Sequence, residues 1–180
     1  MKEKRSLRLL AEGGLIAAMY VALTVAVAPT AFGPVQFRIS EMLTILPVLT
    51  PAAVPGLAVG CLVSNLFGLM SGTNPAGALD LVLGPLATLS AAYLTYRLRG
   101  ITVRGVPVLS SLPPVLINAV VIGAELAVAY YTQLTPGILL FNMLCVGAGQ
   151  LAACVVCGLL LHAALYRSGA AGILFRRPTE

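Results

Sequence analysis

Long apolar segments, separated by short turn-rich connections, make up almost the whole chain. Their lengths and positions predict six helical spans, at residues 9–28, 38–50, 54–70, 79–96, 115–131 and 138–166. The second span is short and contains Pro47, so we expect an interrupted helix there. The pattern therefore predicts an all-α membrane protein, a bundle of six transmembrane helices forming one domain over residues 1–180.

Composition excludes an ordinary soluble protein. Hydrophobic residues make up 59% of the chain and charged residues only 9%, whereas about 25% of the residues in a soluble domain are charged. The first apolar segment follows a basic N-terminus, as in a signal peptide, but it is long enough to span and residues 26–29 show no convincing cleavage site. We expect it to be a retained helix in contact with the lipid bilayer.

The basic residues predict the orientation of the six spans. All Lys and Arg residues except Arg38 lie in the N-terminal segment, the 97–104 connection or the C-terminal segment. These segments share one side of a six-span protein, and basic segments remain in the cytoplasm. We therefore predict that both termini are cytoplasmic. The net charge of +5 then reflects orientation, and no nucleic-acid partner is expected.

Two spans carry a small residue at every fourth position: Gly14, Ala18, Ala22 and Ala26 in the first, and Gly56, Gly60, Ser64 and Gly68 in the third. Such stripes allow another helix to approach closely within a membrane. The first stripe has two interpretations, packing within the chain or docking against another subunit. Spacing alone favours packing within the chain.

Several polar side chains interrupt the apolar spans at one predicted depth, in the outer half of the protein: Arg38, Glu41, Asn65, Asp80, Glu125 and Asn142. A charge at mid-membrane costs about 2.5–3.5 kcal/mol, and less near the interface. Such groups must therefore be paired, hydrated or in contact with a ligand. Their shared depth favours a polar pocket that opens to the outside.

Structural roles are the alternative for most of these residues. Arg38 and Glu41 are three positions apart and could pair with each other. Asp80 could cap the helix that it begins. The amides Asn65, Asn118, Asn142 and Gln150 could form hydrogen bonds between helices. Glu125 lies within an apolar span, where no comparable structural role suggests itself.

Catalytic motifs are absent from the sequence. There is no phosphate-binding loop, GxSxG or HExxH pattern, and the four cysteines lie in apolar segments. We expect no enzyme activity, metal or cofactor, although an intramembrane enzyme using Asp80 and Glu125 remains an alternative. No internal repeat of broken helices is evident, so we expect a capture module that takes its energy from another protein.

Five segments resemble one known family: AAMYVALTVA (17–26), FGPVQFRISEMLTILP (32–47), GLAVGCLVSNLFG (56–68), DLVLGPLATL (80–89) and INAVVIGAEL (117–126). The family is the queuosine-precursor transport proteins of the QueT type, which are substrate-binding S components of energy-coupling factor transporters. QFRISE is the most specific segment. The last span matches least, because the family often has a Gly-Glu pair where this chain has Gly149 and Gln150.

The resemblance implies a six-helix S component in the cell membrane that binds its substrate from outside. It implies docking onto a transmembrane coupling protein driven by two cytoplasmic ATPase subunits, with Gly14, Ala18 and Ala22 as the docking surface. The implied cargo is a 7-deazaguanine such as preQ1, preQ0 or queuine; another small planar vitamin is the alternative.

The chemistry of such a base suggests roles for the polar residues. Carboxylates accept from its donor edge, and amide or guanidinium groups donate to its carbonyl. We hypothesise that the acceptors are Glu41, Asp80 and Glu125. We expect four further polar side chains to contact the base: Arg38, Asn65, Asn118 and Asn142. The ring that stacks on the flat base would be that of Phe37, Phe67 or Phe141.

Overall fold

A computed structural model describes residues 2–33 and 36–175, and within them every regular element is a helix, apart from one isolated bridge between Val103 and Val106. The elements are α1 (Lys2–Ala26), α2 (Ala28–Ala31), η1 (Ile39–Val48), α3 (Ala53–Met70), α4 (Asp80–Leu98), η2 (Leu109–Ser111), α5 (Leu112–Tyr130), α6 (Pro136–Gln150), η3 (Leu151–Cys157), α7 (Gly158–Arg167) and α8 (Ala170–Leu174).

The all-helical fold class is confirmed, and four helical stretches are long and apolar enough to cross a membrane. In the described part of the chain these are Ser6–Ala26, Ala53–Met70, Leu109–Tyr130 and Pro136–Arg167. The predicted second span is a 3₁₀ helix of 10 residues with Pro47 inside it. The predicted fourth span is the 19-residue helix α4, which is not one of the four stretches.

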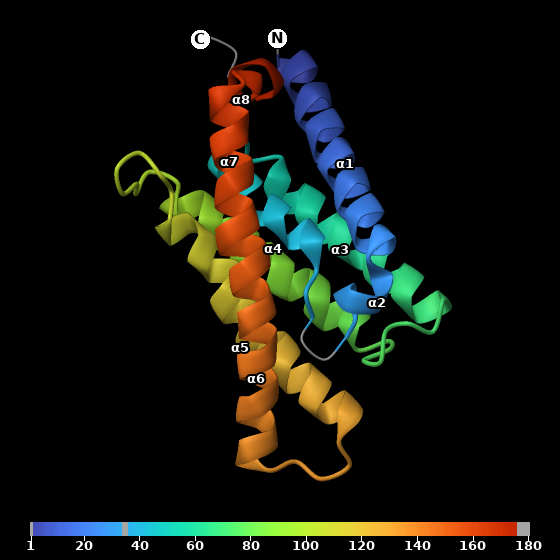
Figure 1. The fold of residues 1–180 in the computed structure, drawn as a ribbon. Helices are drawn as coiled ribbons and strands as arrows, with labels where there is room; N and C mark the ends of the chain where they lie inside the picture. Colours follow the sequence, from blue (N-terminus) through green and yellow to red (C-terminus); the bar gives the residue numbers. More distant parts are fainter. Residues whose placement is uncertain (1, 34–35, 176–180) are drawn as a thin grey trace.

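The helices pack as neighbours in chain order, α3 on α4, α4 on α5 and α5 on α6, while α1 packs on α3. The predicted sixth span consists of three consecutive elements, α6, η3 and α7, which form one long rod (Figure 1). The beginning of α1 and the C-terminal helix α8 lie at the same end of the molecule (Figure 1), where the Arg8 guanidinium donates to the Leu174 carbonyl oxygen at 3.1 Å.

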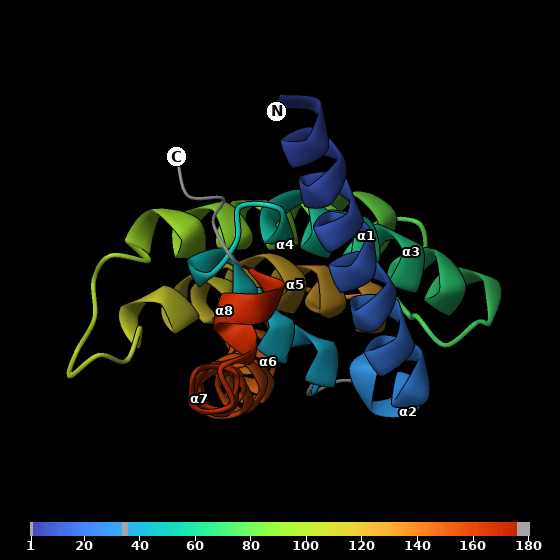
Figure 2. The ribbon, with the colours of Figure 1, turned by 90° about the horizontal axis from the view of Figure 1, so that it is seen from above.

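The short helix η1 lies inside the bundle. It contacts α1, α3, α4 and α7, as well as the π-helical segment η3. In the view from above, η1 lies between α1 and the end-on rod of α7 (Figure 2). Seven of its ten residues are buried, including Glu41. This position carries the polar QFRISE segment into the interior, where its side chains meet those of the long helices.

Glycines bring α1 and α3 into close contact. A Cβ atom on Gly56 would lie 2.6 Å from the Gly13 carbonyl oxygen, and one on Gly60 would lie 2.8 Å from the Tyr20 Cβ atom. Neither position therefore accepts a larger side chain without movement of its neighbour. The predicted close-packing role of the α3 stripe is confirmed.

The predicted stripe on α1 behaves differently. The residues of α1 that meet the α3 glycines are Gly13, Ala17 and Tyr20. Gly14, Ala18 and Ala22 are exposed. A Cβ atom on Gly14 would meet no atom within 4 Å. The interpretation of this stripe as packing within the chain is therefore wrong for the described residues.

Candidate functional site

Mostly polar residues from six segments line one small internal cavity, with a volume of about 10 Å³, roughly the space of one water molecule. These segments are the residues before η1, η1 itself, α3, α4, α5 and α6. The lining residues are Gln36, Arg38, Glu41, Cys61, Asp80, Gly84, Thr88, Asn118, Ile122 and Gln150. The sequence-predicted residues Arg38, Glu41, Asp80 and Asn118 thus lie around one space. Three of them carry ionisable side chains, which are the costliest side chains to bury.

The chain reversal before η1 places the first of these residues. Gln36 adopts a left-handed backbone conformation, with φ of 47°, and Arg38 is extended directly before η1. Both side chains are buried. The reversal thus turns the polar residues of QFRISE toward the bundle interior.

Arg38 is held from several directions. Its guanidinium carbon lies 4.8 Å from the centre of the Phe32 ring, and its Nε donates to the Ala31 carbonyl oxygen at 3.4 Å. Its Nη2 lies 3.9 Å from Oδ2 of Asp80. The predicted alternative of a pair with Glu41 is wrong in the described structure, because Arg38 instead reaches across the cavity to α4.

Asp80 does not cap α4. The residue before the helix is Leu79, and no side chain caps this end. Asp80 Oδ2 instead accepts from the Asn74 amide at 2.7 Å, and the Asn65 amide donates to the Asp80 backbone carbonyl at 2.8 Å. Asn65 therefore holds the first residue of α4 in place through its backbone carbonyl, and it does not line the cavity.

Glu41 is tied to α1 on one side only. The Tyr20 hydroxyl donates to its Oε1, while Oε2 has no hydrogen-bond partner. Nearby, the hydroxyls of Thr24 and Ser40 lie 2.7 Å apart. These contacts join the inner face of α1 to η1, directly beside the cavity.

Unpartnered polar atoms are the most informative feature of the cavity. Three buried atoms of its lining residues make no hydrogen bond in the described structure: Arg38 Nη2, Glu41 Oε2 and Asp80 Oδ1. Leaving such a group unsatisfied costs about 1–3 kcal/mol, and native proteins rarely tolerate it without a reason. A small ligand that carries both donors and acceptors would satisfy all three.

Glu125 is buried but lies outside the cavity lining. It is 3% exposed, and neither carboxylate oxygen has a hydrogen-bond partner in the described chain. It follows the lining residue Ile122 by three positions, and Asn118 by seven, so all three share one face of α5. Glu125 is therefore an unsatisfied carboxylate on the cavity side of α5, about one turn beyond the lining.

Asn142 and the predicted stacking rings are not brought to the cavity. The Asn142 amide donates to the Ile138 carbonyl of its own helix at 2.9 Å. Phe67 is 40% exposed and Phe141 59% exposed, while Phe37 is partly buried without lining the space. Phe67 follows the buried Asn65 by two positions, a rotation of about 200° on a helix, so it faces outward.

Several residues of the site were missed by the sequence reasoning. Gln36, Cys61 and Thr88 line the cavity, as does Gln150, whose role the sequence left open. Helical spacing was the available signal, since Cys61 precedes Asn65 by four positions and Thr88 follows Asp80 by eight. Phe32, whose ring lies beneath Arg38, gave no such signal because it precedes the reversal.

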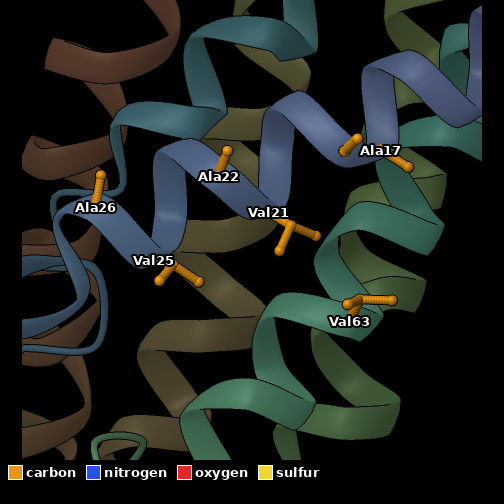
Figure 3. A pocket seen from close by; sticks show the side chains of 7 residues that line it. Ala17, Val21, Ala22, Val25, Ala26 and Val63 are labelled. Carbon is orange, nitrogen blue, oxygen red and sulfur yellow. The ribbon is translucent and has the colours of Figure 1, made fainter.

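A second, apolar hollow lies on the outside of the bundle along α1. It is an open groove lined by Ala17, Ala18, Val21, Ala22, Val25, Ala26 and Val63. Figure 3 shows these side chains along α1, with Val63 contributed by α3. Two of the three predicted docking residues, Ala18 and Ala22, thus line a shallow apolar surface that no other described element covers.

Comparison with known proteins adds a family to this geometry. Residues 10–167 match the QueT transporter family. A 77-residue segment is 31% identical to a protein of Lactococcus lactis subsp. cremoris (strain MG1363) named queuosine precursor transporter QueT, and it covers 42% of this chain and 41% of that protein. No solved structure matches. Because the family match extends over most of the helical bundle, the chain belongs to the QueT transporter family.

Proposed function

We propose that this protein is the substrate-binding S component of an energy-coupling factor importer and that it binds a queuosine precursor at the internal cavity, which widens to admit the base. The observation that carries the proposal is the set of unpartnered atoms of Arg38, Glu41 and Asp80 around one enclosed space. The family and the named relative supply the cargo class.

A 7-deazaguanine base matches this set of groups. Its pyrimidine edge carries adjacent N–H donors, which a carboxylate accepts as a pair, and its carbonyl accepts from an amide or guanidinium. Glu41 and Asp80 offer the acceptors, and Arg38 and Asn118 offer donors. Each bond would satisfy a group that is otherwise buried at a cost, so binding would relieve that cost.

Glu125 extends the match to a cationic cargo. An aminomethyl group on the deazaguanine is protonated at neutral pH, and a buried ammonium needs a carboxylate close by. Glu125 has both oxygens free and faces the same side of α5 as Asn118. We assign it the role of counter-ion, which requires Ile122 to move aside as the cargo enters.

Membrane topology follows from the same proposal. We place α1, η1, α3, α4, α5 and the α6–α7 rod as six membrane segments of the cell membrane, with the ends at α1 and α8 in the cytoplasm. The basic residues near these ends, and their common position in the bundle, support this orientation. The cavity then receives its cargo from the outside.

Energy for uptake would come from partners. We propose that the groove along α1, including Ala18 and Ala22 with Gly14 beside it, docks onto a transmembrane coupling protein that two cytoplasmic ATPase subunits drive. Small residues on an open helix face allow another helix to pack closely in lipid. The exposed position of all three residues supports this assignment.

The test is binding of labelled 7-aminomethyl-7-deazaguanine to the purified protein, compared with Glu41→Gln, Asp80→Asn and Glu125→Gln. We expect each substitution to weaken binding at least tenfold, which corresponds to about 1.4 kcal/mol. Glu125→Gln should weaken binding of the aminomethyl base more than that of the neutral nitrile analogue. Ser90→Ala, on the exposed face of α4, is the matched control.

Two results would overturn the proposal. One is wild-type affinity in both Glu41→Gln and Asp80→Asn, which would remove the cavity from the binding site. The other is tighter binding of a different planar vitamin in a thermal-shift panel, where a ligand at 100 times its Kd stabilises the protein by about 2.7 kcal/mol. That outcome would keep the cavity and change the cargo.

A further inference from the structure

Gln150 lines the same cavity as Glu41 of η1 and Asp80 of α4. It is the last residue of α6, it is 2% exposed, and it lines the space that holds Arg38, Glu41 and Asp80. The backbone changes at the next residue to the π-helical segment η3, which carries Cys154. Such π-helical segments often occur at functional sites, and this one begins directly after a residue that lines the cavity.

One contact fixes the Gln150 side chain. The Cys154 Sγ lies 3.1 Å from Gln150 Oε1 and donates to it. Both residues are buried. A thiol is a weak donor and a weak acceptor. Where an amide N–H donates to a thiol in this structure, from Asn65 to Cys61, the two atoms lie 3.6 Å apart, so a reversed Gln150 amide would be crowded at 3.1 Å. Cys154 therefore favours one orientation of the amide.

The consequence is a directed donor at the cavity. With Oε1 engaged by Cys154, the two N–H donors of Nε2 are the groups of this amide that remain for a ligand in the cavity that Gln150 lines. The cavity therefore presents donors at Gln150 and Arg38 and acceptors at Glu41 and Asp80. A ligand must place an acceptor atom at the Gln150 position to use this group.

We propose that Gln150 is a specificity-determining residue that donates to the ring carbonyl of the cargo, and that Cys154 is a positioning residue that holds the amide in its donating orientation. This inference rests on the proposed binding of a 7-deazaguanine base in the cavity. It predicts selection for a base with a carbonyl at that ring position over one with an amino group there.

The thiol decides this selection because an amide is otherwise ambiguous. A glutamine that is free to reverse presents either its N–H groups or its oxygen, and so accepts a carbonyl or an amino group with small energetic difference. A site whose polar groups are fixed rejects the mismatched partner, because a buried group is then left unpaired. Removal of the thiol should therefore change selectivity more than affinity.

The experiment measures the Kd values of two uncharged bases, 7-deazaguanine and its 2,6-diamino analogue, for the full-length purified protein. The ratio of the two Kd values is the readout, because a general loosening of the fold changes both values together. We expect Cys154→Ala to lower the preference for the carbonyl base about tenfold, and Cys154→Ser to restore it. Cys157→Ala, which removes a thiol from the same η3 segment but outside the cavity lining, should leave the ratio unchanged.

A second variant tests Gln150 itself. Gln150→Glu replaces the directed donor by an acceptor of the same length, so we expect the preference to shift toward the diamino base. An unchanged ratio in both Cys154→Ala and Gln150→Glu would overturn this inference while leaving binding in the cavity intact. Failure of the wild-type protein to bind either base would instead overturn the proposed function.

Discussion

The two faces of α1 differ by one residue position, yet one is closed and the other is open. Gly13, Ala17 and Tyr20 are buried against α3, where Gly56 and Gly60 provide room for the backbone of α1. Gly14 and Ala18 lie about 100° around the same helix and are exposed. Small residues permit close approach, but the shape of the facing helix decides which face is used.

The closed face also reaches the cavity. Its residue Tyr20 donates to Glu41, and Thr24 contacts Ser40, so α1 is bonded to η1, the helix that carries the lining carboxylate Glu41. The open face carries the apolar groove. One helix thus joins the proposed substrate site to the proposed docking surface. Substitutions on its closed face should change stability and substrate binding, whereas substitutions on its open face should change uptake alone.

The largest effect is expected where the closed face is tightest, at Gly56→Val. Its Cβ would lie 2.6 Å from the Gly13 carbonyl oxygen, and backbone cannot rotate away as a side chain can. We expect a loss of about 3 kcal/mol of stability, at the upper end for overpacking, measured by thermal unfolding in detergent. Gly14, the residue after Gly13 on α1, faces open space, so Gly14→Val should unfold near the wild-type temperature. An equal loss of stability in both variants would contradict the distinction between the closed and open faces of α1.

A smaller effect is expected from Tyr20→Phe on the same closed face. The ring still fills its site, but the Glu41 carboxylate loses its only hydrogen-bond donor among the described residues, which costs about 1–3 kcal/mol for a buried group. Binding of the 7-deazaguanine base should weaken as well, because Glu41 is no longer held beside the cavity. Tyr166→Phe, at an exposed tyrosine, serves as the control, and an unchanged Tyr20→Phe protein would show that Glu41 needs no partner.

Periodicity and charge placement predicted most of the fold. Apolar segment lengths located most helix ends within about three residues, although α1 begins at Lys2 rather than at residue 9. Pro47 correctly marked the second segment as short and irregular. The cost of buried charge correctly singled out Arg38, Glu41 and Asp80, which line one cavity. These features follow from local sequence and from the energetics of single groups in lipid.

Features that depend on helix rotation were not predictable. The pairing of Arg38 with Asp80 rather than Glu41, and the choice of Gly13 rather than Gly14, depend on how η1 and α3 turn against α1. Phe67 was expected at the cavity but faces outward for the same reason. Depth in the membrane can be estimated from sequence, whereas rotation about a helix axis is set by tertiary contacts.

Gly14→Ala offers a modest test with the opposite sign. A Cβ at Gly14 would meet no atom within 4 Å, so the only effect within the molecule is the better helix propensity of alanine, about 0.5–1 kcal/mol. We expect a small rise in the unfolding temperature. At Gly13→Ala the Cβ would lie 3.2 Å from the Ala52 carbonyl oxygen, so that gain should be offset, and a similar rise in both variants would mean that α1 and α3 can separate freely.

The smallest effect on the isolated protein, but the clearest effect on uptake, is expected from Ala18→Leu combined with Ala22→Leu. Both positions are exposed in the groove, so stability should stay within about 0.5 kcal/mol and the Kd for the base should not change. Uptake of labelled precursor by cells should nevertheless fall strongly, because leucine side chains fill the surface on which a partner helix would pack. Val82→Leu adds bulk at another exposed position, on α4, and should leave uptake intact. Wild-type uptake by the double variant would place the docking surface elsewhere, whereas a loss of binding with uptake would mean that the open face of α1 also supports the cavity.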